Sequence, residues 1–532
     1  MKPFLTLITS LSSSPESASY SLQYLQNLDT FTILETGPLE FFSQNSEQYV
    51  RAINSKDLVS SKDRTKIGPR IRLHKGDEGR VLSLSGEPLV VCWNIAYSAL
   101  DLFLATIDFF LSTPSGEKSF LIIGSPLSME VVIDLIGTIL PLMNSLLKSE
   151  HPSLSSFISP SLFYNLFQII QRVGSMGTPS IPILTSTLEV ISTLAPRFPQ
   201  EVWAYFKQSG IVFSTTTYNG FGGIHQGGSI QSKFHFFNLL ATFECPTGRY
   251  SLTLTFLKLV SSLLELLKTQ QQMQVQAQNQ FQLEGSQRPI SPTNFSISSA
   301  DSMTLSTSSL NFREQAMKST IELQAEVLSS CLSYIQNDIF LAYDSWRYEK
   351  IIERFQIGSS VLNIFDSIIS SASIHLLSPT VSPIQSQSEK VALKTSGDTL
   401  EALQKAIFDN FLSERSFSNV SPLLSIIGLG KETVESLYRR SRNNEAREVE
   451  KMIIIGFNLL NKLLMKRKAD QNNVSKLENA LFEKTIGKDH RQLTTIIANY
   501  IHYPFNPVFF FFFSFSFFSY LIFPISKQKK RN

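Results

Sequence analysis

The apolar positions of the chain recur mostly at intervals of three and four residues, the spacing of a helix with one apolar face. The clearest stretch follows the turn Pro246-Thr247-Gly248 and begins at about Ser251. Its apolar stripe consists of Phe256, Leu257, Val260, Leu263, Leu264 and Leu267. A stripe this wide needs a partner surface to cover it. The segment therefore predicts a helix that packs against other helices.

Similar stripes before and after this segment predict that most of the chain is helical. The predicted helices span residues 96–111, 129–148, 162–173, 183–194, 201–208, 251–267, 324–343, 349–369, 399–412, 421–429, 432–441, 445–466 and 492–502. Prolines separate several of them and mark turns. Short helices joined by such turns, without alternating strands, favour an all-α fold, an irregular α-solenoid of the HEAT or armadillo kind, over an α/β enzyme. No fixed repeat period is visible.

One segment, residues 71–94, departs from the helical spacing. Its apolar residues alternate with polar ones from Gly79 to Trp93, and Ser85-Gly-Glu-Pro88 marks a turn between two strand-like runs. The pattern predicts a small β hairpin or barrel fragment inserted among the helices, with an exposed β loop as the alternative. Residues 1–70, which precede it, mix short apolar runs with polar residues and predict short helices.

Two polar segments divide the helical part. Residues 269–312 are rich in Gln and then in Ser and Thr, and residues 370–397 are also poor in apolar side chains. Such composition buries too little apolar surface to offset the entropy of ordering. We expect the first to be a disordered insertion and the second a polar linker. The solenoid would then consist of residues 95–268, 313–369 and 398–503.

The last segment, residues 504–532, is unlike the rest of the chain. Val508 to Phe523 is an apolar run of 16 residues, mostly Phe, and a basic stretch follows it. We interpret the run as the translation of a thymine-rich noncoding stretch, so that the chain would be a truncated gene model. The alternative is a short tail anchor, slightly below the ~20 residues that span a bilayer core.

Composition narrows the class of protein. Charged residues make up only 17% of the 532 residues and the net charge is +3, which disfavours a nucleic-acid-binding surface. The three cysteines, Cys92, Cys245 and Cys331, lie far apart and favour reduced thiols over a disulfide framework. The N-terminus is too weakly apolar for a signal peptide.

The sequence contains no convincing reaction centre. The Gly-rich run Gly220–Gly228 lacks the flanking strand and helix of a dinucleotide loop, and Gly428–Thr433 lacks the first glycine and the Lys-Ser/Thr pair of a phosphate loop. None of the seven histidines pairs with another at the three- or four-residue spacing of a metal site. We therefore expect no catalytic, cofactor-binding or metal-binding residues, and a non-enzymatic binding or scaffold role.

The tryptophans stand beside the predicted helical stripes. Trp93, Trp203 and Trp346 are interpreted first as core residues, with a partner contact as the alternative. Trp346-Arg347-Tyr348 falls between two predicted helices, where aromatic rings can pack at a corner while their polar edges stay wet.

Several of these stretches resemble one protein family, the large scaffold nucleoporins, and among them the nucleoporin 188 family, with its sister class second. The similar stretches are 246–264, 346–348, 91–100, 201–203 and 493–503. The residues that carry the resemblance are Trp93, Tyr97, Trp203, Gly248, Tyr250, Thr253, Phe256, Leu257, Trp346, Arg347, Tyr348 and Tyr500. Family members are much longer, so the chain resembles an N-terminal to middle piece.

The resemblance implies an α-solenoid in the inner ring of the nuclear pore complex, at the nuclear envelope. Its partners would be other inner-ring nucleoporins, with transport receptors as a further class, without direct nucleic-acid binding and without cofactors. Barrier nucleoporins carry many Phe-Gly repeats, whereas this chain has one Phe-Gly dipeptide, Phe221-Gly222. We therefore expect a structural scaffold. The alternative is a membrane-tethered helical adaptor, which requires that the Phe-rich run is natural.

Overall fold

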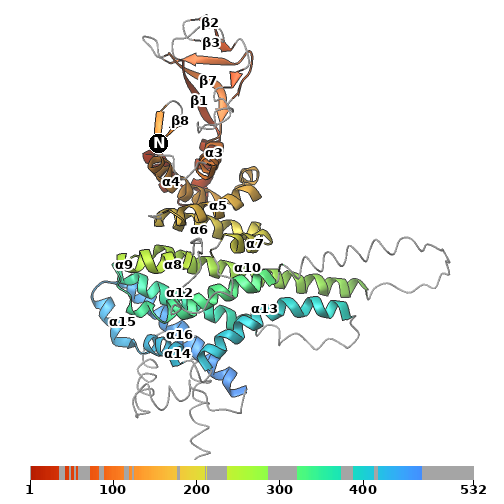
Figure 1. Ribbon diagram of the computed structural model, residues 1–532, viewed down its shortest axis with the longest axis vertical. Helices are drawn as coiled ribbons and strands as arrows, with labels where there is room; N and C mark the ends of the chain where they lie inside the picture. The colour runs from red at the N-terminus through yellow and green to blue at the C-terminus, as the bar shows by residue number, and fades with distance from the viewer. Residues whose placement is uncertain are drawn as a thin grey trace, which may run out of the picture. The chain divides into compact units, whose positions relative to one another are not determined.

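The structure is a computed structural model that divides the chain into two compact units, Met1–Phe198 and Pro199–Asn532 (Figure 1). It describes residues 2–34, 42–46, 49–52, 56–57, 72–82, 89–112, 119–122, 125–176, 180–209, 211, 236–285, 320, 322–372, 387–412 and 417–469. Among these residues helices dominate both units, and the strands all belong to the first. The expected helical class with an inserted β element is confirmed.

The first unit begins with two helices, α1 (Lys2–Leu11) and α2 (Pro15–Gln26). Ser14 starts α2 with a capping box, because its hydroxyl accepts from the Ser17 amide at 3.2 Å and the Ser17 hydroxyl accepts from the Ser14 amide at 3.2 Å. Pro15 fits the first helical turn, where no amide donor is needed. The pattern of predicted short helices holds for this part of the chain.

A five-stranded antiparallel sheet follows, in the order β1-β7-β6-β3-β2. Its strands are β1 (Leu28–Leu34), β2 (Phe42–Ser46), β3 (Tyr49–Ala52), β6 (Glu78–Val81) and β7 (Leu89–Tyr97). Two short pairs accompany it, β4 (Lys56–Asp57) with β5 (Arg72–Leu73) and β8 (Ser119–Ile122) with β9 (Ser125–Ser128). The buried cluster here consists of Val50, Ala52, Val81, Val91 and Trp93 of the sheet and Leu73 of β5.

Close packing at Gly79 shapes this core. Gly79 pairs with Trp93 across β6 and β7, and a Cβ atom added to Gly79 would lie 2.9 Å from the Trp93 Cε3 atom and still nearer to the Val91 side chain. Only a residue without a side chain lets the indole lie over the neighbouring strand.

The prediction of a β hairpin between Gly79 and Trp93 is confirmed, since β6 and β7 pair antiparallel. The prediction that residues 1–70 are helical is wrong beyond α2, because β1 to β4 lie there. The strand β1 pairs with β7, more than fifty residues later, so its extended conformation depends on a partner that local spacing does not reveal. The turn Ser85–Pro88 lies outside the described residues.

Helices complete the first unit. They are α3 (Ala99–Ser112), α4 (Met129–Leu147), α5 (Pro160–Gly174) and α6 (Ile181–Leu194), with the 3-10 turns η2 (Pro152–Ser156) and η3 (Ala195–Arg197). The four helices agree with the predicted ones within a few residues. The helix α4 packs on α1 and α6 and buries its apolar face. Among the described helices, Glu130–Leu147 of α4 has the length and apolar character of a membrane span, but half of it is buried inside the unit.

The second unit consists of helices joined by turns, with no strand among its described residues. Its elements are α7 (Glu201–Gln208), α8 (Phe236–Leu239), the π-helical η4 (Leu240–Glu244), α9 (Cys245–Thr247), α10 (Ser251–Gly285), a helix at 322–334, the π-helical η5 (Ile335–Phe340), the 3-10 turn η6 (Tyr343–Ser345), α12 (Ile351–Ala372), α13 (Gln387–Leu412), α14 (Phe417–Ile427), α15 (Gly430–Arg439) and α16 (Asn443–Ala469). The helix α12 is central, because it packs against α10, α13 and α16 (Figure 1).

Two predicted boundaries in this unit are wrong. The helix α10 continues to Gly285, into the expected disordered insertion, and α13 begins at Gln387, inside the expected linker. Gln is a good helix former, and no Pro or Gly interrupts α10 before Gly285, so the helix extends beyond its apolar stripe. The rest of both segments, the loop 220–228, the predicted helix 492–502 and the tail 504–532 lie outside the described residues.

Candidate functional site

The most densely connected site among the described residues is a corner where the start of α10 meets the segment that leads into α12. The Tyr250 ring stacks on Trp346, with centroids 4.9 Å apart and planes 9° from parallel, and its other neighbour is the tilted Tyr348 ring at 4.8 Å. The Tyr250 hydroxyl donates to the Arg347 carbonyl at 3.0 Å, and the Tyr348 hydroxyl donates to the Tyr343 carbonyl at 2.6 Å. Tyr250 is 1% exposed, whereas Trp346 and Tyr348 are half-buried, so the Tyr250 ring is the part of this corner that lies in the core.

Gly248 lets the two backbones touch at this corner. Its φ is +72°, and its carbonyl accepts a hydrogen bond from the Glu349 amide at 2.9 Å. An added Cβ atom would lie 3.1 Å from both the Arg347 carbonyl oxygen and the Glu349 nitrogen. The left-handed conformation and the close approach each favour glycine.

A buried carboxylate, Glu244, caps the first turn of α10. Its Oε1 accepts from the Leu252 amide at 2.7 Å, and its Oε2 accepts from the Thr253 amide at 2.9 Å and from the Thr253 hydroxyl at 2.6 Å. These bonds satisfy donors that the helix itself leaves open. Burial nevertheless raises the pKa of Glu244 to about 7, against the opposing effect of the three hydrogen bonds.

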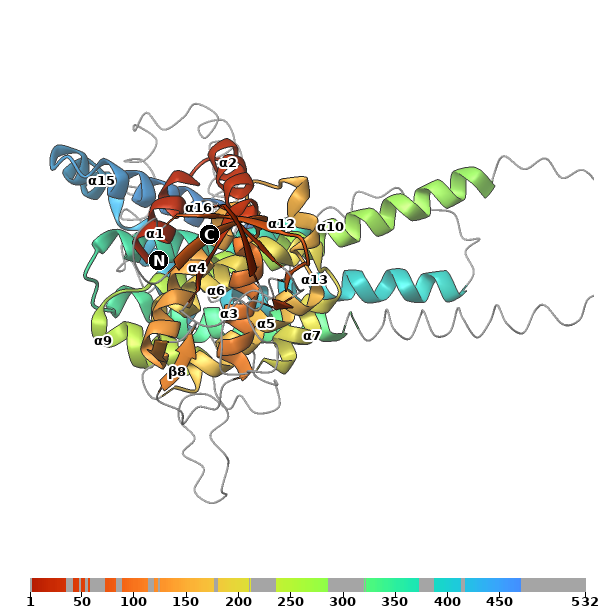
Figure 2. The ribbon, with the colours of Figure 1, turned by 90° about the horizontal axis from the view of Figure 1, so that it is seen from above.

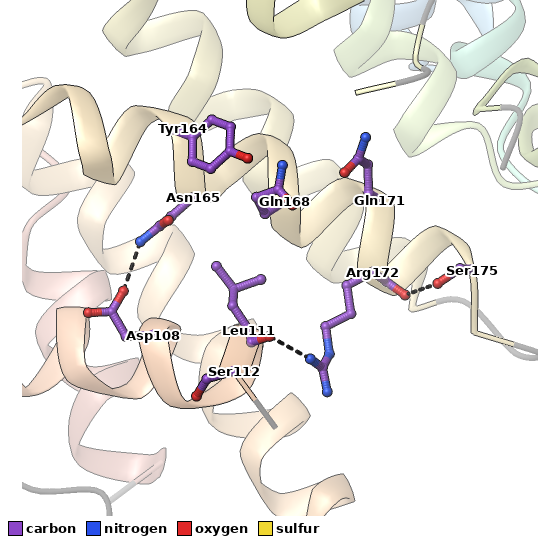
Figure 3. A pocket seen from close by; sticks show the side chains of 9 residues that line it. All are labelled: Asp108, Leu111, Ser112, Tyr164, Asn165, Gln168, Gln171, Arg172 and Ser175. Carbon is purple, nitrogen blue, oxygen red and sulfur yellow. Dashed lines mark hydrogen bonds between the residues drawn. The ribbon is translucent and has the colours of Figure 1, made fainter. Parts of the chain in front are cut away.

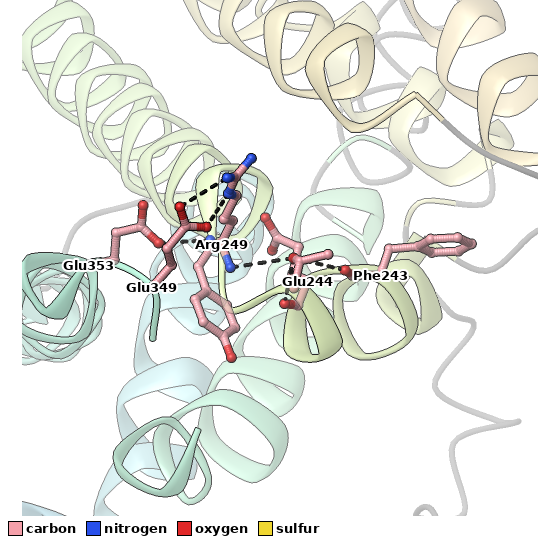
Figure 4. Close-up of polar contacts among 7 residues, drawn as sticks. Phe243, Glu244, Arg249, Glu349 and Glu353 are labelled. Atoms are coloured by element: carbon pink, nitrogen blue, oxygen red, sulfur yellow. Dashed lines mark hydrogen bonds and ion pairs between the residues drawn. The ribbon is translucent and has the colours of Figure 1, made fainter. Parts of the chain in front are cut away.

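Charged groups close the outer side of the corner (Figure 4). The Arg249 guanidinium forms a two-pronged ion pair with Glu349, of which the Nη2 to Oε1 contact is 2.9 Å long. Glu353 accepts from the Tyr250 amide at 2.9 Å. The hydrogen bond from Arg249 lowers the pKa of the exposed Glu349 carboxyl. The pair is solvent-exposed, so its main effect is to orient the two segments rather than to stabilise them strongly.

The structure therefore brings together five of the residues that carry the family resemblance: Gly248, Tyr250, Trp346, Arg347 and Tyr348. Three more lie on the buried face of α10: Thr253, Phe256 and Leu257. Phe256 contacts the ring of Phe237 edge-on, with centroids 5.5 Å apart. These eight residues form one connected part of the second unit.

The remaining residues of that set lie elsewhere. Trp93 is buried in the sheet, Trp203 is buried on α7, and the half-buried Tyr97 ends β7 rather than opening α3. Tyr500 lies outside the described residues. Burial of both Trp93 and Trp203 agrees with the core interpretation rather than with a partner contact.

The sequence analysis missed the acidic residues of the corner. Glu244 stands seven positions before the first residue of α10, so no local capping signal points to it. Glu349 and Glu353 accept hydrogen bonds from Arg249 and from the Tyr250 amide, which lie about a hundred residues earlier in the chain. Their partners are set by the packing of α10 on α12, which sequence spacing does not encode.

A groove in the first unit is the second candidate (Figure 3). It has a volume of about 520 Å³ and lies between the end of α3 and the exposed side of α5. Its lining residues are Asp108, Leu111, Ser112, Tyr164, Asn165, Gln168, Gln171, Arg172 and Ser175. Six of these nine residues carry an amide or hydroxyl group, and such groups can donate to or accept from a peptide backbone.

Hydrogen bonds hold the groove walls together. The Asn165 amide donates to the Asp108 carboxylate at 2.8 Å, and Arg172 donates to the Leu111 carbonyl at 2.9 Å. The Arg172 guanidinium also lies 4.7 Å from the centroid of the Phe110 ring, and burial lowers the Arg172 pKa. Neither the groove nor the corner joins a nucleophile to a base. Among the described residues, no three His, Cys, Asp or Glu side chains could together hold a metal ion.

Comparison with known proteins gives one consistent result. A family model described as Nucleoporin Nup188, N-terminal subdomain III, matches residues 121–283 and 302–522, more than half of the chain. Nucleoporin NUP188 of Xenopus tropicalis is 21% identical over 519 residues, and Nucleoporin NUP188 of Homo sapiens is 21% identical over 522 residues. Each alignment covers 95% of this chain and 24% of the relative. The chain thus spans about a quarter of the length of the curated relatives it matches.

Replacing Gly248 with Ala tests the backbone contact at the corner. We expect Gly248→Ala to destabilise the Pro199–Asn532 unit by at least about 1–2 kcal/mol, the cost of a left-handed conformation for a residue with a Cβ atom. Scanning calorimetry should show this loss. The matched control is Gly456→Ala in α16, where an added Cβ atom would meet only ordinary contacts of 3.5 Å or more. It should be neutral or stabilising, and equal losses in the two variants would contradict the role of Gly248.

The raised pKa of Glu244 predicts a pH dependence of stability. Between its ordinary pKa of 4.5 and its folded pKa of about 7, the folded chain binds more protons than the unfolded chain. The contribution of Glu244 to the free energy of unfolding therefore falls as pH rises through this window, by up to about 3 kcal/mol. Glu244→Gln should remove this dependence, whatever its effect on absolute stability. Urea unfolding from pH 4.5 to 8 gives the slope of the free energy of unfolding against pH for the wild type and for Glu244→Gln. Identical slopes in the two proteins would rule out the effect.

Proposed function

The chain belongs to the Nup188 family of nucleoporins, and from that premise we propose that it is a structural, non-enzymatic subunit of the nuclear pore scaffold at the nuclear envelope. The observation that carries the proposal is the family match over more than half of the chain. The folding of both units around buried helix-to-helix contacts also supports it, because scaffold proteins present surfaces that such contacts hold in place.

The mechanism is geometric. In the second unit, α12 packs between α10, α13 and α16, and the corner around Gly248 and Tyr250 ties the start of α10 to the start of α12. These contacts fix the directions in which the helices run and so fix the positions of side chains on their outer faces. Partners would bind such faces or grooves without any change in covalent bonds.

The partners in this proposal are other nucleoporins of the inner ring, with transport receptors as a further class. The groove between α3 and α5 supports a protein partner, because amide side chains in its lining suit an extended polypeptide. The hydrogen bonds from Asn165 to Asp108 and from Arg172 to Leu111 hold its two walls together. The net charge of +3 over 532 residues gives little reason to propose a nucleic-acid partner.

The alternative, a membrane-tethered adaptor anchored by Val508–Phe523, has less support. The relatives carry nucleoporin names, and the Phe-rich run lies outside the described residues. No contact or burial in the described part of the chain favours the adaptor.

Localisation in the native cells separates the two functions. A fluorescently tagged chain should form a nuclear rim that coincides with other nucleoporins. The rim should persist when residues 508–523 are replaced by a Gly-Ser linker of equal length, because scaffold binding depends on the helical units. A rim that disappears with the replacement would favour the adaptor, and a diffuse signal for the unaltered chain would contradict both functions.

A further inference from the structure

The groove between α3 and α5 has a negative end and a positive end. The two helices pack against each other in the first unit (Figure 1 and Figure 2). Asp108 and Asn165 line one end of the groove, and Arg172 lines the other (Figure 3). The Asp108 carboxylate accepts from the neutral amide of Asn165, and Arg172 donates to the neutral carbonyl of Leu111. These two bonds hold the charged side chains in place without neutralising their charges.

The helix α5 sets the distance between the two ends. Seven residues separate Asn165 from Arg172, and at about 1.5 Å per residue they lie about 10 Å apart along the helix axis. A polypeptide segment in the polyproline II conformation rises about 3.1 Å per residue and has about three residues per turn. Side chains three residues apart on such a segment lie on one side, about 9 Å from each other. The two ends of the groove therefore match a segment with charged side chains at this spacing.

The middle of the groove suits the main chain of such a segment. Gln168 lies between Asn165 and Arg172, about one helical turn from each. Its side-chain amide can donate one hydrogen bond to a peptide group and accept another from it. Tyr164, which is 40% exposed, and Leu111 offer apolar contact beside it. The lining thus combines one polar anchor for the main chain with two charged ends.

The surroundings of Arg172 favour an acidic group in the groove. Burial lowers the pKa of Arg172, because the half-buried guanidinium has lost part of its hydration. A carboxylate that binds beside the guanidinium offsets this loss with a charge-assisted hydrogen bond. Asp108 at the other end repels an anion and attracts a cation. A nucleic acid, which carries negative charge along its whole length, would meet Asp108 unfavourably.

We propose that the groove between α3 and α5 binds an extended segment of a partner protein that carries a basic side chain and, three residues away, an acidic one. The basic side chain pairs with Asp108, the acidic one pairs with Arg172, and the main chain between them contacts Gln168. Either order of the two charges along the segment provides these contacts. The inference rests on the scaffold function proposed above, because it names the kind of segment through which the scaffold would hold a partner.

Binding of short labelled peptides to the full chain tests the proposal. The probes are fluorescein-labelled peptides with the core Arg-Thr-Val-Glu or Glu-Val-Thr-Arg, flanked by Gly and Ser. Fluorescence anisotropy at low salt should show that at least one of them binds with a dissociation constant of about 10–500 µM, as expected for a contact of this size. The control peptide has the core Thr-Arg-Glu-Val, with the same composition but adjacent charges. It should bind at least about threefold more weakly, because it cannot reach both ends of the groove.

A pair of variants tests the contact at Asp108. Asp108→Asn can still accept from the Asn165 amide but has no charge, and it should weaken binding about two- to fivefold, the effect of one exposed ion pair. The matched control is Asp101→Asn, an exposed aspartate of α3 that does not line the groove, and it should leave binding unchanged. Replacing the Arg of the peptide with Gln should weaken binding to the wild type but not to Asp108→Asn, because the two charges act on each other.

Three results would overturn the proposal. They are two probe peptides that bind no better than the control peptide, Asp108→Asn and Asp101→Asn variants of equal affinity, and a loss from the peptide substitution that is the same in the wild type and in Asp108→Asn. The peptide measurements are separate from the localisation experiment. A nuclear rim with peptides that do not bind contradicts this inference alone, whereas peptides that bind to a chain without a nuclear rim contradict the scaffold function.

Discussion

The hydrogen bond from the Glu349 amide to the Gly248 carbonyl joins two parts of the chain that are far apart in sequence, and the arrangement of the second unit depends on it. It can form only because Gly248 adopts a left-handed conformation and carries no Cβ atom. Once the two backbones touch, Tyr250 reaches the Arg347 carbonyl and stacks on Trp346. This contact ties the start of α10 to the segment that leads into α12.

The same corner contains an electrostatic conflict. Glu244 is 1% exposed, and its carboxylate accepts three hydrogen bonds at the positive end of α10, yet burial still raises its pKa to about 7. A neutral residue would avoid the cost of burying a charge, but it would satisfy fewer of the open amides of the helix. The free-energy cost of holding Glu244 at the first turn of α10 therefore rises with pH.

The sequence predicted the helices well and the sheet poorly, for one reason. The stripes of α4, α6 and α7 repeat within a few residues, and the predicted spans of these helices agree closely with the observed ones. The strand β1 is extended because it pairs with β7, which local spacing does not reveal. The length of α10 was underestimated for the opposite reason, because its Gln-rich end has high helix propensity but no apolar stripe.

The candidate site was predictable only in part. Gly248, Tyr250 and Trp346 stood out through a turn signal, aromatic character and family resemblance. The partners of Gly248 and of the Tyr250 hydroxyl are backbone groups of Glu349 and Arg347, and every residue has such groups, so the sequence could not identify them. The buried face of α1 was equally hidden, because Leu5 and Leu7 are the same residue type, yet Leu5 is buried and Leu7 is exposed.

Amide hydrogen exchange at the corner tests the central claim most directly. If the Gly248 contact and the Glu244 cap hold α10 against α12, the amides of Glu349, Leu252 and Thr253 should exchange as slowly as those in the interior of α12. Rapid exchange at these three amides, with slow exchange inside α10 and α12, would mean that the helices pack without the corner and would contradict the account.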